Sequence, residues 1–246
     1  MSYSIKDKTV LITGANRGIG KAFVDSFMEH GAARIYAAVR TVDSAFPLVE
    51  QYEDKIIPIH LDLTDTDSIS AAARIAKDVQ VVVNNAGVLT KTNPLDEDAI
   101  SALEFEMNTN VYGLIRMARA FSPVLEANSG SVFVQINSVG SVKYFSPVAT
   151  YCASKAAAYS ITQALWELLG TQGTIVLSVH PGPFATDMAD MLGVTKIAEP
   201  PSLVPEAVME ALQSGAFHVF PGLYASQLGE AYKEFAASQS IPDVRG

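Results

Sequence analysis

The segment KTVLITGANRGIG, residues 8–20, joins a short apolar run to a glycine-rich turn and then to a pattern of helical spacing. Gly14, Gly18 and Gly20 fall in the turn. Glycines there allow a tight bend and a close approach of the backbone to a pyrophosphate, while the first turn of the helix offers N–H groups to the anion. The spacing is G-x-x-x-G-x-G rather than the general G-x-G-x-x-G fingerprint. The segment therefore predicts a dinucleotide-binding strand–turn–helix unit, with a purely structural turn as the alternative.

Short β-branched runs recur along the chain and alternate with segments of helical length. Strands are predicted at 8–13, 34–39, 55–60, 79–84, 131–137, 174–180 and 217–220, and helices at 18–30, 67–77, 98–126, 150–169 and 205–213. Strands that are nearly continuous apolar runs are typical of a parallel sheet buried on both faces. We expect a single doubly wound Rossmann-type α/β domain over residues 1–246, with about seven parallel strands and helices on both faces.

The segment 183–204 has a mixed character and contains the pair Pro200-Pro201 near its end. It follows the carboxyl end of a predicted strand, where loops of α/β proteins carry function. We expect it to form a mobile lid over the substrate.

Composition excludes several classes of protein. The 246 residues are 49% apolar and 17% charged, with a net charge of −9. An acidic surface repels phosphate backbones and anionic lipid heads, so neither nucleic acid nor a membrane is an expected partner. The single cysteine, Cys152, the absence of a signal-peptide pattern at the start and short apolar runs predict a cytoplasmic protein. Histidine and cysteine spacing predicts no metal site.

The segment YCASK, residues 151–155, places a tyrosine and a lysine one helical turn apart on one face. Small residues fill and follow the gap, which leaves room for a ligand. An ordinary surface pair is the alternative. A phenol titrates too high to be an efficient acid or base at neutral pH, and a nearby ammonium lowers its pKa. We therefore expect Tyr151 to exchange a proton with a carbonyl or alcohol oxygen, and Lys155 to lower the pKa of Tyr151 together with an oxidised nicotinamide.

These segments belong to a longer series that resembles the short-chain dehydrogenase/reductase family in its compact form of roughly 250 residues, over essentially the whole chain. The motifs follow in order: TGANRGIG at 13–20, NNAG at 84–87, Asn110 in EMNTNVYG, Ser138 in INSVG, YCASK at 151–155 and PGPFATDM at 181–188. The resemblance implies a catalytic set of Asn110, Ser138, Tyr151 and Lys155. Lys155 would also hold the nicotinamide ribose, and Asn110 a water that relays protons to the lysine.

Two of these assignments have competitors nearby. Ser138 directly follows a predicted strand, as the family's serine does, and its hydroxyl would hydrogen-bond the substrate oxygen; Ser141 is the competing serine. Asn110 and Gly113 match the family's N-x-x-G pattern, with Asn108 as the competing asparagine. An asparagine that only kinks the helix remains an alternative at position 110.

The choice of cofactor follows from charge. An NAD site usually has an acid at the end of the second strand, to bind the ribose 2′-OH. This chain has Arg40 there instead, and Arg17 inside the glycine turn. Two guanidinium groups would bind a 2′-phosphate, so we expect NADP(H) to be preferred. Asp43 leaves NAD(H) open as an alternative. The predicted cofactor-binding residues are Gly14, Asn16, Arg17, Gly18, Ile19, Gly20, Arg40, Asp62, Leu63, Asn85, Ala86, Gly87, Tyr151, Lys155, Pro181, Gly182, Phe184 and Thr186.

The expected substrate wall is apolar, which favours a small-molecule substrate: a neutral hydrophobic ketone or aldehyde, or the matching secondary alcohol. We expect the wall to contain Val88, Leu89, Val139, Val142, Tyr144, Phe145, Phe184, Met188, Met191 and Leu192, with Lys143 and Lys196 as the nearest lysines. The predicted function is that of an NADP(H)-dependent carbonyl reductase. A 3-oxoacyl-thioester reductase and a catalytically silent NADP-binding sensor are the alternatives.

Helices 98–126 and 150–169 carry apolar residues beyond one face, among them Trp166. The family commonly pairs these helices between subunits, which implies a homodimer or homotetramer. A Trp166 buried in the core of one subunit is the alternative.

Overall fold

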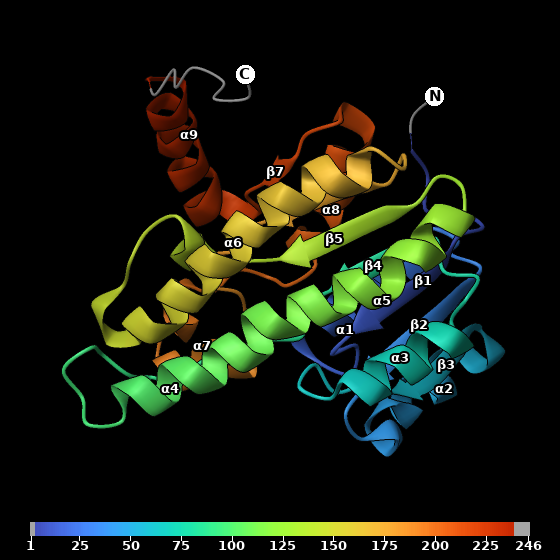
Figure 1. Cartoon of the computed structure of the whole chain (residues 1–246), viewed down its shortest axis with the longest axis horizontal. Coiled ribbons are helices and arrows are strands. Elements are labelled where there is room, and N and C mark those ends of the chain that lie inside the picture. Colours follow the sequence, from blue (N-terminus) through green and yellow to red (C-terminus); the bar gives the residue numbers. More distant parts are fainter. Residues whose placement is uncertain (1–2, 239–246) are drawn as a thin grey trace.

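The computed structural model describes residues 3–238, with side chains as far as Lys233. Seven parallel strands form one sheet in the order β3-β2-β1-β4-β5-β6-β7 (Figure 1). The strands are β1 (Thr9–Thr13), β2 (Arg34–Val39), β3 (Ile56–His60), β4 (Val81–Asn84), β5 (Val132–Ile136), β6 (Ile175–Val179) and β7 (His218–Val219). The chain reverses the direction of strand addition between β3 and β4, so the switch point lies between β1 and β4. This confirms the predicted doubly wound fold.

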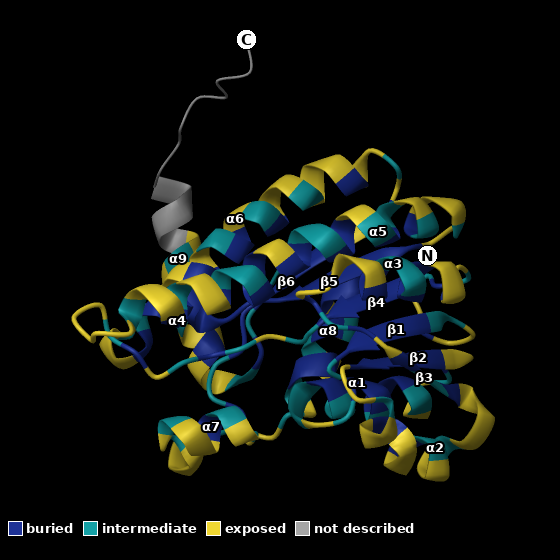
Figure 2. Ribbon diagram, turned by 60° about the horizontal axis from the view of Figure 1, so that its bottom comes forward, coloured by how far each residue is buried: buried dark blue, intermediate teal, exposed yellow. Residues whose placement is uncertain are grey.

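Helices cover both faces of the sheet (Figure 1). They are α1 (Gly18–Glu29), α2 (Phe46–Tyr52), α3 (Thr66–Ile75), α4 (Ala99–Glu106), α5 (Gly113–Ala127), α6 (Ala149–Gly170), α7 (Asp187–Leu192), α8 (Leu203–Ser214) and α9 (Gly222–Ser238). Two apolar cores result, because alternate strand residues point to opposite faces. Val10 and Ile12 pack on the side of α1, α2 and α8, whereas Leu11 and Val82 pack on the side of α3, α5 and α6. Figure 2 shows the strands buried between these layers.

Several elements differ from the sequence prediction. The predicted helix 98–126 is divided, because a π-helical turn (Met107–Tyr112) separates α4 from α5. Helices α2, α7 and α9 were not predicted. The segment 183–204 contains α7 and a 3-10 turn (Thr195–Ile197), and residue 184 forms an isolated parallel bridge with residue 199. No helix within residues 3–238 combines the length and apolar character needed to cross a bilayer.

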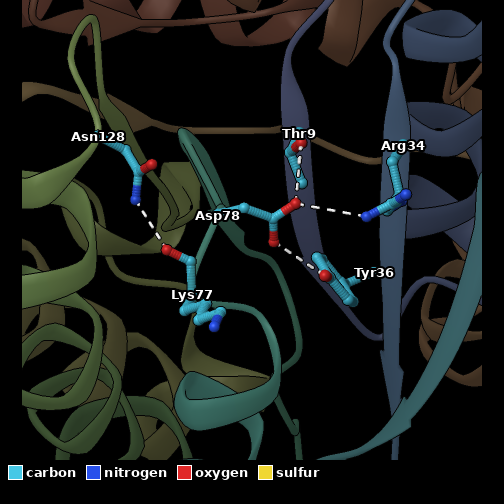
Figure 3. Close-up of polar contacts among 6 residues, drawn as sticks. All are labelled: Thr9, Arg34, Tyr36, Lys77, Asp78 and Asn128. Carbon is cyan, nitrogen blue, oxygen red and sulfur yellow. Dashed lines mark hydrogen bonds and ion pairs between the residues drawn. The ribbon is translucent and has the colours of Figure 1, made fainter.

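Polar contacts fasten the sheet at the amino ends of its strands (Figure 3). The Asp78 carboxylate accepts hydrogen bonds from Tyr36 at 2.8 Å and from Thr9 at 3.5 Å, and it pairs with Arg34 at 3.5 Å. Asn128 donates to the Lys77 carbonyl at 2.9 Å, which ties the end of α5 to the same loop. These contacts hold β1 and β2 together at their amino ends. The loops that form the site lie at the opposite, carboxyl ends of the strands.

Candidate active site

A large cavity of about 1070 Å³ opens at the carboxyl ends of the strands. In doubly wound sheets, ligands bind in the crevice at the point where strand order reverses. Every residue predicted to bind the cofactor lines this cavity except Gly20, and Ser138, Tyr151 and Lys155 of the predicted catalytic set line it as well. Loops distant in sequence therefore bring the predicted residues together in one place.

The glycine turn has the geometry that its sequence predicts. Gly14 and Gly18 have φ values of +66° and +53°, which favour glycine. Gly20 lies behind the turn: a Cβ on it would stand 2.0 Å from the Gly14 carbonyl oxygen. Gly20 therefore serves the packing of α1 on the turn, and no side chain caps the first turn of α1. This open backbone and the volume of the cavity fit a dinucleotide pyrophosphate.

Thr13, at the end of β1, holds the glycine turn against the NNAG segment. Its hydroxyl accepts hydrogen bonds from the backbone N–H groups of Asn85 at 2.9 Å and Ala86 at 3.0 Å. The Asn85 side chain donates to the Thr13 carbonyl at 2.9 Å. Asn84 is buried and donates to Gln135 at 2.7 Å, so it ties β4 to β5. The loops after β1 and β4 therefore form one braced floor for the cavity.

The two cationic residues predicted to bind a 2′-phosphate have different surroundings. Arg40 is exposed at the end of β2, and His60 Nδ1 contacts its carbonyl at 2.8 Å. Arg17 pairs with Asp187 of α7 at 2.5 Å, with both side chains largely exposed. A phosphate at Arg17 would therefore compete with the Asp187 carboxylate. Asp43, the residue that kept NAD open, does not line the cavity, whereas Thr41 and Ser44 do.

Asp62 lines the cavity and also holds the turn that follows it. One carboxylate oxygen accepts from the Thr64 N–H at 2.8 Å and from its hydroxyl at 2.7 Å. The backbone bond from Thr64 is the main reason that the pKa of Asp62 is lowered. Contact of Asp62 and Leu63 with the cofactor stays a prediction.

Tyr151 and Lys155 lie on the buried face of α6, 8% and 4% exposed. The Lys155 amine is 5.8 Å from the centroid of the Tyr151 ring and donates to the Ile136 carbonyl at 2.9 Å. Ser138 begins the turn after β5, and its Oγ accepts from the Gly140 N–H at 3.0 Å. The Tyr151 phenol, the Lys155 amine and the Ser138 hydroxyl thus share one buried corner of the cavity. Tyr151 and Lys155 are therefore not an ordinary surface pair.

The electrostatics of this corner correct one expectation. Burial raises the pKa of Tyr151 to about 12; the nearby Ser138 hydroxyl lowers it, and Cys152 and Glu106 raise it. Burial also lowers the pKa of Lys155 to about 8. The expected lowering by the ammonium is wrong for the protein's own groups. Desolvation is the larger effect, and the amine donates its hydrogen bond to Ile136 instead of to the phenol.

Asn110 braces the site without lining the cavity. It lies in the π-helical turn, where its Oδ1 accepts from the Val88 N–H and its Nδ2 donates to the Val88 carbonyl and to Ser154 Oγ, each at 2.9 Å. A Cβ on Gly87 would stand 3.0 Å from Asn110 Oδ1 and 3.5 Å from the Lys155 amine. Asn110 and Lys155 therefore flank the same glycine, and the water relay stays a prediction.

The competing residues take other roles. Ser141 bonds the Ser138 carbonyl and His180 Nδ1, at 2.5 and 2.7 Å, and does not line the cavity. Asn108 accepts hydrogen bonds from Arg116. His180 is buried, and burial lowers its pKa to about 3, so it acts as a neutral hydrogen-bonding group. These contacts leave Ser138 as the serine that faces the cavity.

Most of the residues predicted for the apolar wall line the cavity. Val142 and Tyr144 are exceptions, because neither lines the cavity and Tyr144 is 75% exposed. Lys143 and Lys196 do not line it, whereas Lys91, which the sequence analysis missed, does. Lys91 closely follows the NNAG motif and the wall residues Val88 and Leu89 in the sequence, and this position could have identified it. Residues 3–233 contain no cluster of three or more His, Cys, Asp or Glu side chains suited to a metal ion.

Comparisons with known proteins agree with this geometry. The short chain dehydrogenase family profile matches residues 8–196. A short chain dehydrogenase, pigC of Monascus ruber, is 31% identical over 196 residues, which are 75% of this chain and 65% of that protein. The NADP-dependent 3-hydroxy acid dehydrogenase of Schizosaccharomyces pombe is 28% identical, with 83% and 85% covered.

Among solved structures, a short chain dehydrogenase from Burkholderia cenocepacia in complex with NADP superposes with a TM-score of 0.86 at 29% identity, covering 98% of this chain and all of that one. Fold, site geometry and the matched profile lead to one conclusion. The chain belongs to the short-chain dehydrogenase/reductase family of nicotinamide-dependent oxidoreductases.

Proposed function

We propose that the protein is an NADP(H)-dependent carbonyl reductase, or secondary-alcohol dehydrogenase, that acts on a neutral hydrophobic ketone or aldehyde. The observation that carries the proposal is the buried corner of Tyr151, Lys155 and Ser138, which lies beside an apolar wall in the cavity that also contains Arg17 and Arg40. We further propose a cytoplasmic homo-oligomer in which the segment 183–204 is the substrate lid. The buried thiol of Cys152 is consistent with a reducing compartment.

The residues divide the reaction between them. When bound along the glycine turn and the arginines, NADPH would supply the hydride that reduces the carbonyl carbon. Tyr151 gives its phenolic proton to the carbonyl oxygen, and the Ser138 hydroxyl stabilises the charge that develops there. Afterwards the Tyr151 phenolate regains a proton from solvent by way of the Lys155 amine, and Asn110 keeps the neighbouring loop in place through its hydrogen bonds to Val88. In the direction of alcohol oxidation the phenolate accepts the proton instead.

Preference for NADP follows from Arg40, which is exposed at the cavity with no acid replacing it at the end of β2. We expect Arg40→Asp to raise the Kd for NADPH about 10- to 100-fold, because a charge-assisted phosphate contact becomes a repulsion. The Kd for NADH should stay within about threefold of the wild-type value, since NADH carries no 2′-phosphate. Binding is measured by fluorescence titration; equal loss for both cofactors would contradict the proposal.

A second candidate is a substrate with a carboxylate, because Lys91 lines the cavity next to the apolar wall. The relative from Schizosaccharomyces pombe is named for 3-hydroxy acids. Kinetics with matched ketones, 3-oxo acids and 3-oxoacyl thioesters separate the candidates. A preference for the acid that Lys91→Glu abolishes supports the second one. A preference for the thioester overturns the neutral-ketone proposal, and binding of NADPH without turnover of any substrate identifies a sensor.

A further inference from the structure

Glu106, the last residue of α4, is a fully buried acid that lies outside the predicted catalytic set. Its side chain is 0% exposed. Oε1 accepts hydrogen bonds from the Thr90 N–H at 2.7 Å and from the Thr90 hydroxyl at 2.5 Å. Oε2 is buried and has no hydrogen-bond partner among the described residues. Burying an acid with one oxygen unbonded costs free energy, and such groups are commonly kept for a functional role.

The segment that Glu106 holds is part of the substrate wall. Val88 and Leu89 line the cavity immediately before Thr90. Asn110, one helical turn after Glu106, grips Val88 through both its N–H and its carbonyl, while Glu106 grips Thr90. Residues one turn apart on one stretch of helix therefore hold the wall segment at two places, Val88 and Thr90.

Glu106 also lies next to the start of the catalytic helix. Helices α4 and α6 run in the same direction and pack together (Figure 1). Asn110 bonds Ser154 across this interface at 2.9 Å, and one turn earlier on each helix stand Glu106 and Thr150. The Thr150 hydroxyl is a second buried oxygen without a partner in the described part of the chain. Thr150 directly precedes Tyr151, so both unbonded oxygens belong to residues one turn before the Asn110–Ser154 contact, where α6 begins.

We propose that Glu106 is a positioning residue for the reaction: it holds the wall segment 88–90 against the catalytic helix and sets the charge around Tyr151. This inference rests on the proposed function, because it assumes that Tyr151 exchanges a proton with substrate. The carboxylate acts on the wall segment through its hydrogen bonds to Thr90, and on Tyr151 through its charge.

The electrostatic part has a definite sign. The charge on Glu106 is among the causes that raise the pKa of Tyr151, after burial. The other groups around the phenol are Cys152 and Lys155 from α6 and the Ser138 hydroxyl from the turn after β5. Removing the Glu106 charge should therefore lower the pKa of Tyr151, so that phenolate forms at a lower pH. A carboxyl group that only fills space would leave this titration unchanged.

The test compares Glu106→Gln with Thr90→Val and its matched control Thr90→Ser, using the alcohol that the wild type oxidises with NADP. For Glu106→Gln we expect the rising limb of kcat/KM against pH to move about half a pH unit lower. Thr90→Val should raise the KM for the organic substrate about fivefold, because the wall loses one hydrogen bond, with the limb unmoved. Thr90→Ser should resemble the wild type, and the Kd for NADPH should stay constant throughout.

The inference is overturned if, in Glu106→Gln, the pH of the rising limb of kcat/KM and the KM for the organic substrate are both the same as in the wild type. If that variant does not fold, as judged by circular dichroism and NADPH binding, Thr90→Val decides, and a wild-type KM in it overturns the inference. A wild-type protein that turns over no alcohol or carbonyl is a different result, because it overturns the proposed function.

Discussion

Burial disfavours the charged forms of both Tyr151 and Lys155, but only the phenol is uncharged at neutral pH. The pKa of the phenol is raised to about 12 and that of the amine is lowered to about 8. A protonated phenol is the form required to reduce a carbonyl, so the protein's own groups favour a proton donor over a proton acceptor at neutral pH. A positive nicotinamide ring beside the phenol would act in the opposite direction.

Lys155 makes the stability of the protein depend on pH. The folded-state pKa of about 8 lies below the model value of 10.5, so between these values the unfolded chain binds more protons and stability rises with pH. The advantage of Lys155→Met over the wild type in free energy of unfolding should therefore shrink by about 1–3 kcal/mol between pH 7 and pH 10. Urea denaturation at both pH values measures it, with the exposed Lys143→Met as control. A constant difference would show that Lys155 is not desolvated.

These residues are predictable from the sequence, but their electrostatics are not. The i to i+4 spacing of Tyr151 and Lys155 predicts a shared helix face, which the structure confirms. Spacing cannot show that both side chains would be more than nine-tenths buried, or that the amine would donate to Ile136 from a different strand. Glu106 was missed for the same reason, because its partner Thr90 lies in a loop whose path depends on the whole fold.

The glycine turn and α1 form one packed unit. A Cβ at position 20 would meet the backbone oxygen of Gly14 at 2.0 Å, and backbone cannot move aside as a side chain can. Gly20→Ala should therefore cost about 3 kcal/mol of stability or more and weaken NADPH binding. Gly170, at the end of α6, has no neighbour within 4 Å, so Gly170→Ala is the control and should be neutral or slightly stabilising. Thermal unfolding measures both; equal effects would contradict this packing.

Regular elements were easier to predict than interruptions. All seven strands and the helix after the glycine turn are close to their predicted bounds, because apolar periodicity reports burial directly. The π-helical turn at Met107–Tyr112 has no periodic signature, although it places Asn110 where it can bond both Val88 and Ser154. Helix α7 was missed because only six residues form it and tertiary contacts, such as that between Asp187 and Arg17, hold it.

The outer face of the assembled molecule suggests where copies of the chain meet. On α6, Leu168 is 64% exposed and Trp166 is 52% exposed, although the tryptophan also packs on Phe217 with ring centroids 5.3 Å apart. Figure 2 shows exposed positions along the outer side of this helix. An apolar, exposed helix face is typical of a subunit interface. We therefore predict that the protein is a dimer or tetramer that pairs through α6.

The prediction is checked by sedimentation velocity. Leu168→Glu should shift the protein to a smaller species without loss of its circular dichroism signal, because a charge on an interface is not solvated. Ile75→Glu, which changes a residue on α3 that is 56% exposed, is the control and should leave the mass unchanged. A monomeric wild type, or no effect of Leu168→Glu, would show that this face is not an interface.

Proton transfer from the Tyr151 phenol is central to the proposed reaction. It is tested by the turnover of Tyr151→Phe with NADPH and a carbonyl that the wild type reduces. The change removes one oxygen from a buried ring, so folding and the Kd for NADPH should persist. We expect the rate of NADPH oxidation to fall at least about 100-fold, the usual contribution of a general acid. Turnover at the wild-type rate, with NADPH still bound, would show that Tyr151 is not the proton donor.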